Sequence, residues 1–195
     1  MTQEFDIGLD VSTSIIGICI VDRKTGALVY LASIKLNKAR LVDIWDKALE
    51  FRKEFQNILI ALSATHPGHV FKRIYVEDIA KKFSPGFSSA GTIVILAKMN
   101  AIVCMSVYDA LGIKPTFVNV RSARATLGVK INTADKTKST KEKVFEIVQR
   151  LNPSFPWTTH VAKTGKKKGQ TVFDTECQDM ADSWVVARGG QSICP

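Results

Sequence analysis

The chain has 195 residues, 46% of them hydrophobic, which suits a single domain over residues 1–195 with a substantial core. Its 27 Lys and Arg outnumber 18 Asp and Glu, giving a formal net charge of +9. We find no membrane-spanning apolar run, signal peptide, CxxC pair or metal-ligating histidine spacing, so the sequence favours a soluble intracellular protein that does not act on membranes and has neither a zinc site nor a disulfide framework.

The first third of the chain predicts a three-stranded antiparallel meander. Residues 5–11 and 15–21 are apolar and rich in β-branched side chains, and residues 27–36 repeat this character after the turn DRKTG. A helix follows over 39–63, where apolar residues recur at helical spacing.

The remainder alternates between strands and helices. A short strand at 73–77 precedes a long apolar helix at 89–111, and a fifth strand covers 115–120. Short helices are predicted at 121–127 and 140–151, and a last helix at 176–188. Residues 152–171, with NPSFPW and GKKKG, read as a basic loop or insertion. This order predicts an α/β fold in which a mixed five-stranded RNase H-like sheet is flanked by helices.

The stretch FDTECQDMADSW gathers four acids near the end of this basic chain: Asp174, Glu176, Asp179 and Asp182. Asp179 and Asp182 are three residues apart and therefore share one helix face, which Glu176 continues towards the N-terminus. Acids also suit a solvated helix N-terminus. The stretch alone is thus compatible with either a helix end or a metal site.

Two further acids end predicted strands, Asp10 in IGLDVS and Glu77 in IYVED. If these strands are parallel neighbours, both carboxylates emerge at one sheet edge, where Asp179 and Asp182 can join them. Such carboxylates repel one another unless cations neutralise them, and hard oxygen ligands suit Mg²⁺, or Mn²⁺ in its place. Two such ions can hold the attacking water and the leaving oxygen of a phosphodiester.

The positive charge is concentrated in one segment, because residues 114–168 contain 13 Lys and Arg against three acids. Such a segment favours a nucleic acid partner, although a solvated Lys-rich surface has the same composition. The basic residues of this segment that we expect to contact DNA are Arg121, Arg124, Lys130, Lys136, Lys138 and Lys141.

The loop KKFSPGFSS after the fourth strand offers further contacts. Phe83 or Phe87 could stack on an unpaired base, and Lys81 and Lys82 could bind phosphate. A core or interface position for the rings, and simple exposure of the lysines, are the alternatives.

At this point the chain resembles the RuvC-type Holliday junction resolvases of the RNase H-like superfamily. The resemblance is carried by FDIGLDVSTSIIGICIVD, IYVEDIAKKF, GTIVILAKMNAIVCMSVYDALG, FVNVRSARATLGVK, KSTKEKVFEIV and QDMADSWVVA, and so covers most of the chain. It implies a Mg²⁺-dependent endonuclease that cuts four-way DNA junctions and leaves 5′-phosphate and 3′-hydroxyl ends.

By position, the resemblance makes the metal ligands and catalytic acids Asp10, Glu77, Asp179 and Asp182. Arg124 and Lys141 best match the family's DNA-binding and catalytic lysines; Arg at the first position departs from the usual Lys. The resemblance also implies a homodimer built on the helix 89–111. That helix is apolar nearly all round, a pattern that burial within one subunit would also explain.

Other functions remain open from the sequence. The same fold could cut flaps, forks or RNA–DNA hybrids. A different class is an actin-like or sugar-kinase-type ATPase, since IGLDVSTS resembles the first phosphate loop of those proteins. They need two such domains, however, and would not need the DMAD acids or the basic segment. An inactive DNA-binding module is a further alternative, against which the four intact acids argue.

Overall fold

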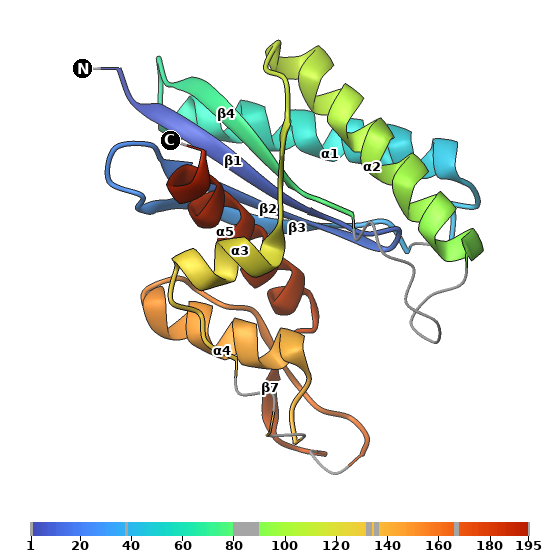
Figure 1. The fold of residues 1–195 in the computed structure, drawn as a ribbon. Coiled ribbons are helices and arrows are strands. Elements are labelled where there is room, and N and C mark those ends of the chain that lie inside the picture. Colours follow the sequence, from blue (N-terminus) through green and yellow to red (C-terminus); the bar gives the residue numbers. More distant parts are fainter. Residues whose placement is uncertain are drawn as a thin grey trace.

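The computed structural model describes residues 2–37, 39–79, 90–131, 134, 137–165 and 168–194. A mixed five-stranded sheet lies at its centre (Figure 1). β1 (Glu4–Val11), β2 (Ile15–Asp22) and β3 (Leu28–Lys35) form the antiparallel meander, and β4 (Val70–Glu77) and β5 (Thr116–Val118) continue in parallel beside β1. The strand order β3-β2-β1-β4-β5 confirms the predicted fold class.

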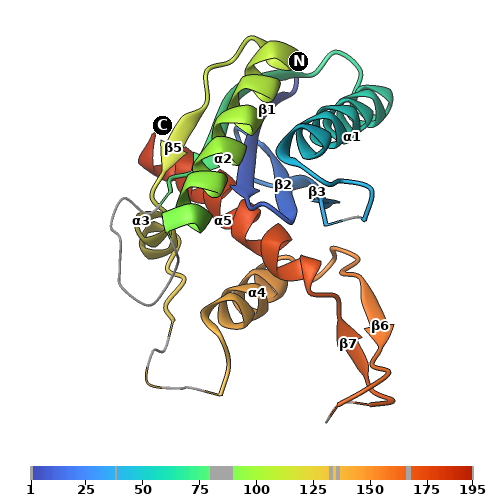
Figure 2. The same cartoon turned by 90° about the vertical axis from the view of Figure 1, so that its right-hand side faces the viewer.

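The sheet has two differently used faces because successive side chains of a strand point to opposite sides. Along β1, Ile7 and Leu9 belong to the core under α1 (Ile44–Thr65) and α2 (Ala90–Leu111). The helix α5 (Glu176–Ile193) contacts β1, β2 and β4 on the other face. Figure 2 shows the sheet between these two helical layers.

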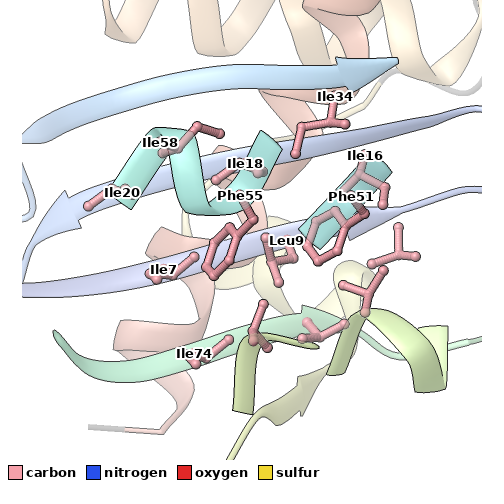
Figure 3. Packing of buried hydrophobic residues seen from close by; sticks show 14 of the residues in the cluster. Ile7, Leu9, Ile16, Ile18, Ile20, Ile34, Phe51, Phe55, Ile58 and Ile74 are labelled. Atoms are coloured by element: carbon pink, nitrogen blue, oxygen red, sulfur yellow. The ribbon is translucent and has the colours of Figure 1, made fainter. Parts of the chain in front are cut away.

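The core beneath α1 and α2 is built from branched aliphatic and aromatic side chains (Figure 3). Phe51 and Phe55 of α1 stack with ring centroids 5.6 Å apart and are almost fully buried against the strands. The residues that line this packing in the picture are Ile7, Leu9, Ile16, Ile18, Ile20, Ile34, Phe51, Phe55, Ile58 and Ile74.

α1 begins five residues later than its apolar spacing suggested. Asp43 is its N-cap, and its Oδ1 accepts hydrogen bonds from the backbone N–H groups of Trp45 (2.8 Å) and Asp46 (3.0 Å). The Asp46 carboxylate in turn accepts from the Asp43 N–H, which completes a capping box. The cap fixes the helix start after residue 43.

α2 corrects one expectation. Its 22 residues include an 18-residue window of mean hydropathy 1.8, so by length and composition alone it could cross a membrane. The prediction that no apolar run is long enough to span a membrane is therefore wrong for this helix. Met99, Val103 and Val107 of α2 pack in the core, and 28% of the window is buried.

α3 (Val120–Thr126) and α4 (Thr140–Leu151) pack on the outer side of α5. Ser139 caps α4 through a capping box with Glu142. Val144, Phe145 and Val148 of α4 are buried in a second core cluster with α5 residues. This packing places the exposed first turn of α4 beside the start of α5.

The segment 152–171, expected to be a loop or insertion, contains part of a two-stranded hairpin. β6 (Thr159–Val161) pairs antiparallel with β7 (Thr171–Phe173). Trp157 packs its ring 5.1 Å from that of Phe145 of α4 and so fixes this segment to the body.

Candidate functional site

Two glycines let α5 lie directly on the sheet. A Cβ on Gly17 of β2 would overlap the carbonyl of Asp179, and one on Gly8 of β1 would overlap the backbone of Ser183 and Ala187. With no side chain at either position, helix backbone meets strand backbone. The N-terminal half of α5 therefore comes within side-chain reach of the end of β1.

Asp10 and Glu77 lie at the same edge of the sheet and on the same face. The parallel register pairs Leu9 with Val76, so the two acids follow at neighbouring positions. The side chains of Asp10 and Glu77 are hydrogen-bonded to each other. The Asn100 side chain of α2 donates to the Glu77 carbonyl over 3.3 Å and so ties the end of β4 to that helix.

Three of the predicted acids converge on the ammonium of Lys141, from the first turn of α4. Its Nζ lies 2.5 Å from Asp179 Oδ1, and 3.9 Å from both Asp10 Oδ2 and Asp182 Oδ2. Its side chain is 48% exposed, whereas those of Asp10 and Asp182 are 9% and 4% exposed. Among these four side chains, that of Lys141 is thus the one most open to solvent.

Arg124 of α3 supplies the second cation. Its Nη2 donates to Asp182 Oδ1 over 2.9 Å. Its Nε is buried and, among the described residues, has no hydrogen-bond partner. Asp182 is therefore held between Arg124 on one oxygen and Lys141 near the other.

The carboxylates are nevertheless short of positive charge. Burial, followed by the hydrogen bond and charge of Glu77, raises the pKa of Asp10 well above its usual value, and Lys141 only partly opposes this. Burial and the charge of Asp10 raise the pKa of Asp182 to about 6, despite Arg124 and Lys141. Burial lowers the pKa of Lys141, but the carboxylates around it outweigh this effect and raise it.

This donor set fits a hard divalent cation in its chemistry. Carboxylate oxygens from three separate elements converge, and burial, followed by the neighbouring carboxylates, raises the pKa values of Asp10 and Asp182, which a bound cation would oppose. Within the described ranges, no group of three His, Cys, Asp or Glu side chains is itself spaced to hold a metal ion. The Lys141 ammonium lies among the acids instead.

The other two acids of FDTECQDMADSW have different partners. Glu176 forms an ion pair with Lys35 of β3 at 2.5 Å, and Asp174 contacts His160 of β6 at 2.6 Å. The contiguous acidic stretch therefore divides between a helix–sheet contact, the hairpin and the carboxylate cluster.

The predicted DNA-contacting residues are distributed unevenly. Arg124 and Lys141 lie in the cluster, Arg121 and Lys130 are exposed near α3, and Lys138 pairs with Glu146 at 2.5 Å. Five positions fall outside the described residues: Lys81, Lys82, Phe83, Phe87 and Lys136.

Lys163 and Lys168, which are not among the predicted DNA-contacting residues, lie at exposed positions of the hairpin segment. The signal was present in the run GKKKG. Each strand of the hairpin has only three residues, which is too short for a pattern that predicts a strand.

No family model and no curated protein matches the sequence. Among solved structures, the chain is similar to T. thermophilus RuvC in complex with a Holliday junction substrate (TM-score 0.58, 10% identity, covering 98% of this chain and 96% of that one). The fold is RuvC-like. A second Thermus thermophilus RuvC structure gives a TM-score of 0.55 at 11% identity over 97% and 96% of the two chains. The yeast mitochondrial Holliday junction resolvase Ydc2 gives 0.51 at 13% identity over 97% and 78%. At these identities the likeness concerns the fold.

Proposed function

We propose that the chain is a Mg²⁺-dependent endonuclease that resolves four-way DNA junctions, leaving 5′-phosphate and 3′-hydroxyl ends. The observation that carries this proposal is the convergence of Asp10, Asp179 and Asp182, with Glu77 beside Asp10, at one sheet edge of a RuvC-like fold. Solved structures with a similar fold include a RuvC in complex with a Holliday junction substrate and a yeast mitochondrial Holliday junction resolvase.

Asp10, Glu77, Asp179 and Asp182 would hold the metal. The chemistry that Mg²⁺, or Mn²⁺ in its place, would supply is activation of the attacking water and neutralisation of charge on the phosphate. Asp10 projects from a strand end that is fixed in the sheet by its pairing with Gly17 of β2.

The two cations of the cluster would serve the DNA. Lys141 has a flexible, nearly half-exposed side chain, so its ammonium can turn from Asp179 to a phosphate oxygen. Arg124 holds Asp182 through one nitrogen and thereby limits the rotamers of that carboxylate. Phosphate contacts of this kind make affinity fall steeply with salt concentration.

We also propose that the chain acts as a homodimer. A groove between α1 and α2 is lined by Trp45, Leu49 and Met105, which are 70%, 67% and 58% exposed. On α2, Val94 and Ile95 are about half exposed as well. A second copy seated on this face would bury these side chains and place two sites on one junction.

The direct test uses a labelled four-way junction, a flap, an RNA–DNA hybrid and a linear duplex, each with Mg²⁺ or with EDTA. We expect paired symmetric nicks on the junction, with Mg²⁺ only. Preferential cutting of the flap or hybrid would support a nuclease but contradict the four-way junction as its substrate. ATP turnover without cleavage of any substrate would contradict the proposal.

The Asp10→Asn variant tests the site itself. We expect cleavage to fall by at least about 10³-fold while junction affinity stays within about twofold, because Asn removes a metal ligand and leaves the basic surface intact. Glu176→Gln is the matched control, since Glu176 belongs to the same acidic stretch but pairs with Lys35. Full metal-dependent cleavage by Asp10→Asn would reject this site.

A further inference from the structure

The β6–β7 hairpin is a basic projection whose lysines the proposed catalytic cluster does not use. Its sequence from residue 159 to 173, THVAKTGKKKGQTVF, contains four lysines and no acidic residue. Lys163 and Lys168 are exposed. Figure 2 shows the hairpin extending from the N-terminal end of α5 away from the central sheet.

The hairpin is well fixed at its base. The ring of Phe173 packs 5.0 Å from that of Phe145 of α4, and His160 contacts Asp174 at 2.6 Å. The Asp174 N–H also donates to the Thr158 carbonyl over 3.1 Å. These contacts give the projection a defined direction relative to α4 and α5.

Its ladder continues beyond the two short strands. The Ala162 N–H donates to the Gln170 carbonyl over 2.9 Å, and the Gly169 N–H donates to the Ala162 carbonyl over 2.8 Å. Gly165 and Gly169 have φ values of 76° and 81°, so they adopt the left-handed backbone of the turn without strain. Lys163 therefore comes directly after Ala162, whose backbone is hydrogen-bonded across the hairpin.

The base lies at the same end of α5 as the carboxylate cluster, because Asp174 precedes the helix by two residues and Asp179 lies in its first turn. The four residue-to-residue steps from Thr159 to Lys163 span about 13 Å when the backbone is extended. That distance corresponds to about four base pairs of duplex, whose phosphates carry one charge per roughly 1.7 Å.

We propose that this hairpin is an arm that binds the phosphate backbone of a DNA duplex several base pairs from the cleavage point, through Lys163 and Lys168. A free two-stranded hairpin is marginally stable, and the chain anchors this one with two aromatic rings and an acid while Lys163 and Lys168 are exposed. A polyanion suits such a surface better than a protein partner. The inference rests on the proposed function for the identity of the nucleic acid.

The test compares Lys163→Ala/Lys168→Ala with the control pair Lys53→Ala/Lys114→Ala, which removes the same charge. Lys53 is exposed on α1, across the sheet, and Lys114 precedes β5 at the opposite sheet edge from the cluster. Binding of a labelled junction is measured in EDTA between 50 and 200 mM salt, and cleavage with Mg²⁺ at saturating enzyme.

We expect the hairpin variant to bind the junction about tenfold more weakly at 100 mM salt. The slope of log binding constant against log salt concentration should become shallower by about 1 to 2, since each lost phosphate contact removes about 0.9 from it. Its cleavage rate at saturation should stay within about twofold of wild type. The control pair should keep the wild-type slope.

The outcomes separate the two proposals. If the wild type cleaves the junction and the hairpin and control variants have equal affinities and salt slopes, the proposed DNA-binding role of the hairpin is rejected and the proposed nuclease function is supported. Hairpin-dependent DNA binding without cleavage by the wild type would support the arm and overturn the nuclease. A wild type that binds no DNA would overturn both.

Discussion

At the scale of single residues, the candidate site is an arrangement of buried charges that is unfavourable by itself. Asp10 and Asp182 are nearly inaccessible to solvent, and both have raised pKa values because burial and neighbouring carboxylates oppose their ionisation. Arg124 and Lys141 compensate only in part. A protein tends to keep such a cluster where charge is needed for function rather than for stability.

The raised pKa of Asp182 predicts a pH-dependent stability difference in metal-free protein. Its folded pKa of about 6 exceeds the ordinary value of 3.8, so its contribution is most favourable below about pH 4 and is lost as pH rises through 6. Asp182→Asn removes this loss. Between pH 4 and pH 7, we expect the free energy of unfolding of the variant to rise by up to about 3 kcal/mol relative to that of the wild type.

Urea unfolding in EDTA at several pH values measures this difference. Asn can still accept a hydrogen bond from Arg124, so the comparison mainly isolates the charge. A wild-type-minus-variant difference that stays constant from pH 4 to pH 7 would contradict the proposed cost of ionising Asp182. With Mg²⁺ present, the wild type should recover stability relative to the variant.

The strand-end positions of Asp10 and Glu77 could be predicted from sequence because parallel neighbouring strands bring their ends to one edge. The i, i+3 pair Asp179 and Asp182 followed from helical spacing. The position of Lys141 between three carboxylates could not be derived from pattern, since it depends on how α4 packs against α5. The family resemblance singled out Lys141 without giving its contacts.

At the scale of elements, α5 carries both the second core and two of the acids. Its residues from Cys177 to Ala187 are largely buried against the sheet, α3 and α4. Gly8 and Gly17 set its distance from β1 and β2. The spacing between strand and helix backbones therefore decides whether Asp179 and Asp182 can reach Asp10.

Gly17→Ala tests this coupling. The added Cβ would overlap the Asp179 backbone carbonyl, which has no flexible atoms to give way, so α5 must shift. We expect unfolding to become easier by about 1–3 kcal/mol and cleavage to fall more than tenfold. Thermal unfolding and junction cleavage, measured below the melting temperature, check the two effects.

Ser33→Ala, at the β3 position paired with Gly17, is a control that changes the same part of the sheet. A Gly17→Ala protein with wild-type cleavage would show that the approach of α5 does not position Asp179. Destabilisation without loss of cleavage would lead to the same conclusion.

Helices and strands with strong periodicity were predicted well, and the sheet order followed from them. The hairpin at 159–173 was missed because its strands have three residues and most of their side chains are exposed, so no alternation of buried and polar positions marks them. α5 extends to Ile193, beyond the predicted end at 188, and its buried Gly189 and Gly190 lack the apolar side chains that periodicity detects.

At the scale of the whole molecule, the two helical layers differ in surface character. The layer of α1 and α2 exposes large apolar side chains, including Trp45, Leu49 and Met105. The layer of α3, α4 and the hairpin carries the basic residues and borders the carboxylate cluster. This division suits a subunit contact on one side and DNA on the other.

Leu49→Glu with Met105→Glu tests the apolar layer. Two charges in the groove between α1 and α2 should prevent a desolvated contact, so we expect a monomer in analytical ultracentrifugation where the wild type is a dimer. Ile60→Glu, which is 70% exposed on α1 outside the groove, should leave the assembly unchanged. A wild-type monomer at micromolar concentration would refute the dimer.

The position of α5 in the chain has a consequence for biosynthesis. A ribosome makes β1 and Asp10 first and α5, with Asp179 and Asp182, after every other described element. Until α5 emerges, one sheet face has no cover over Cys19 and Tyr75, and the carboxylate cluster lacks two members. A chain in which α5 has not yet been made and docked thus cannot assemble the proposed cutting centre, because Asp179 and Asp182 are absent from the sheet edge.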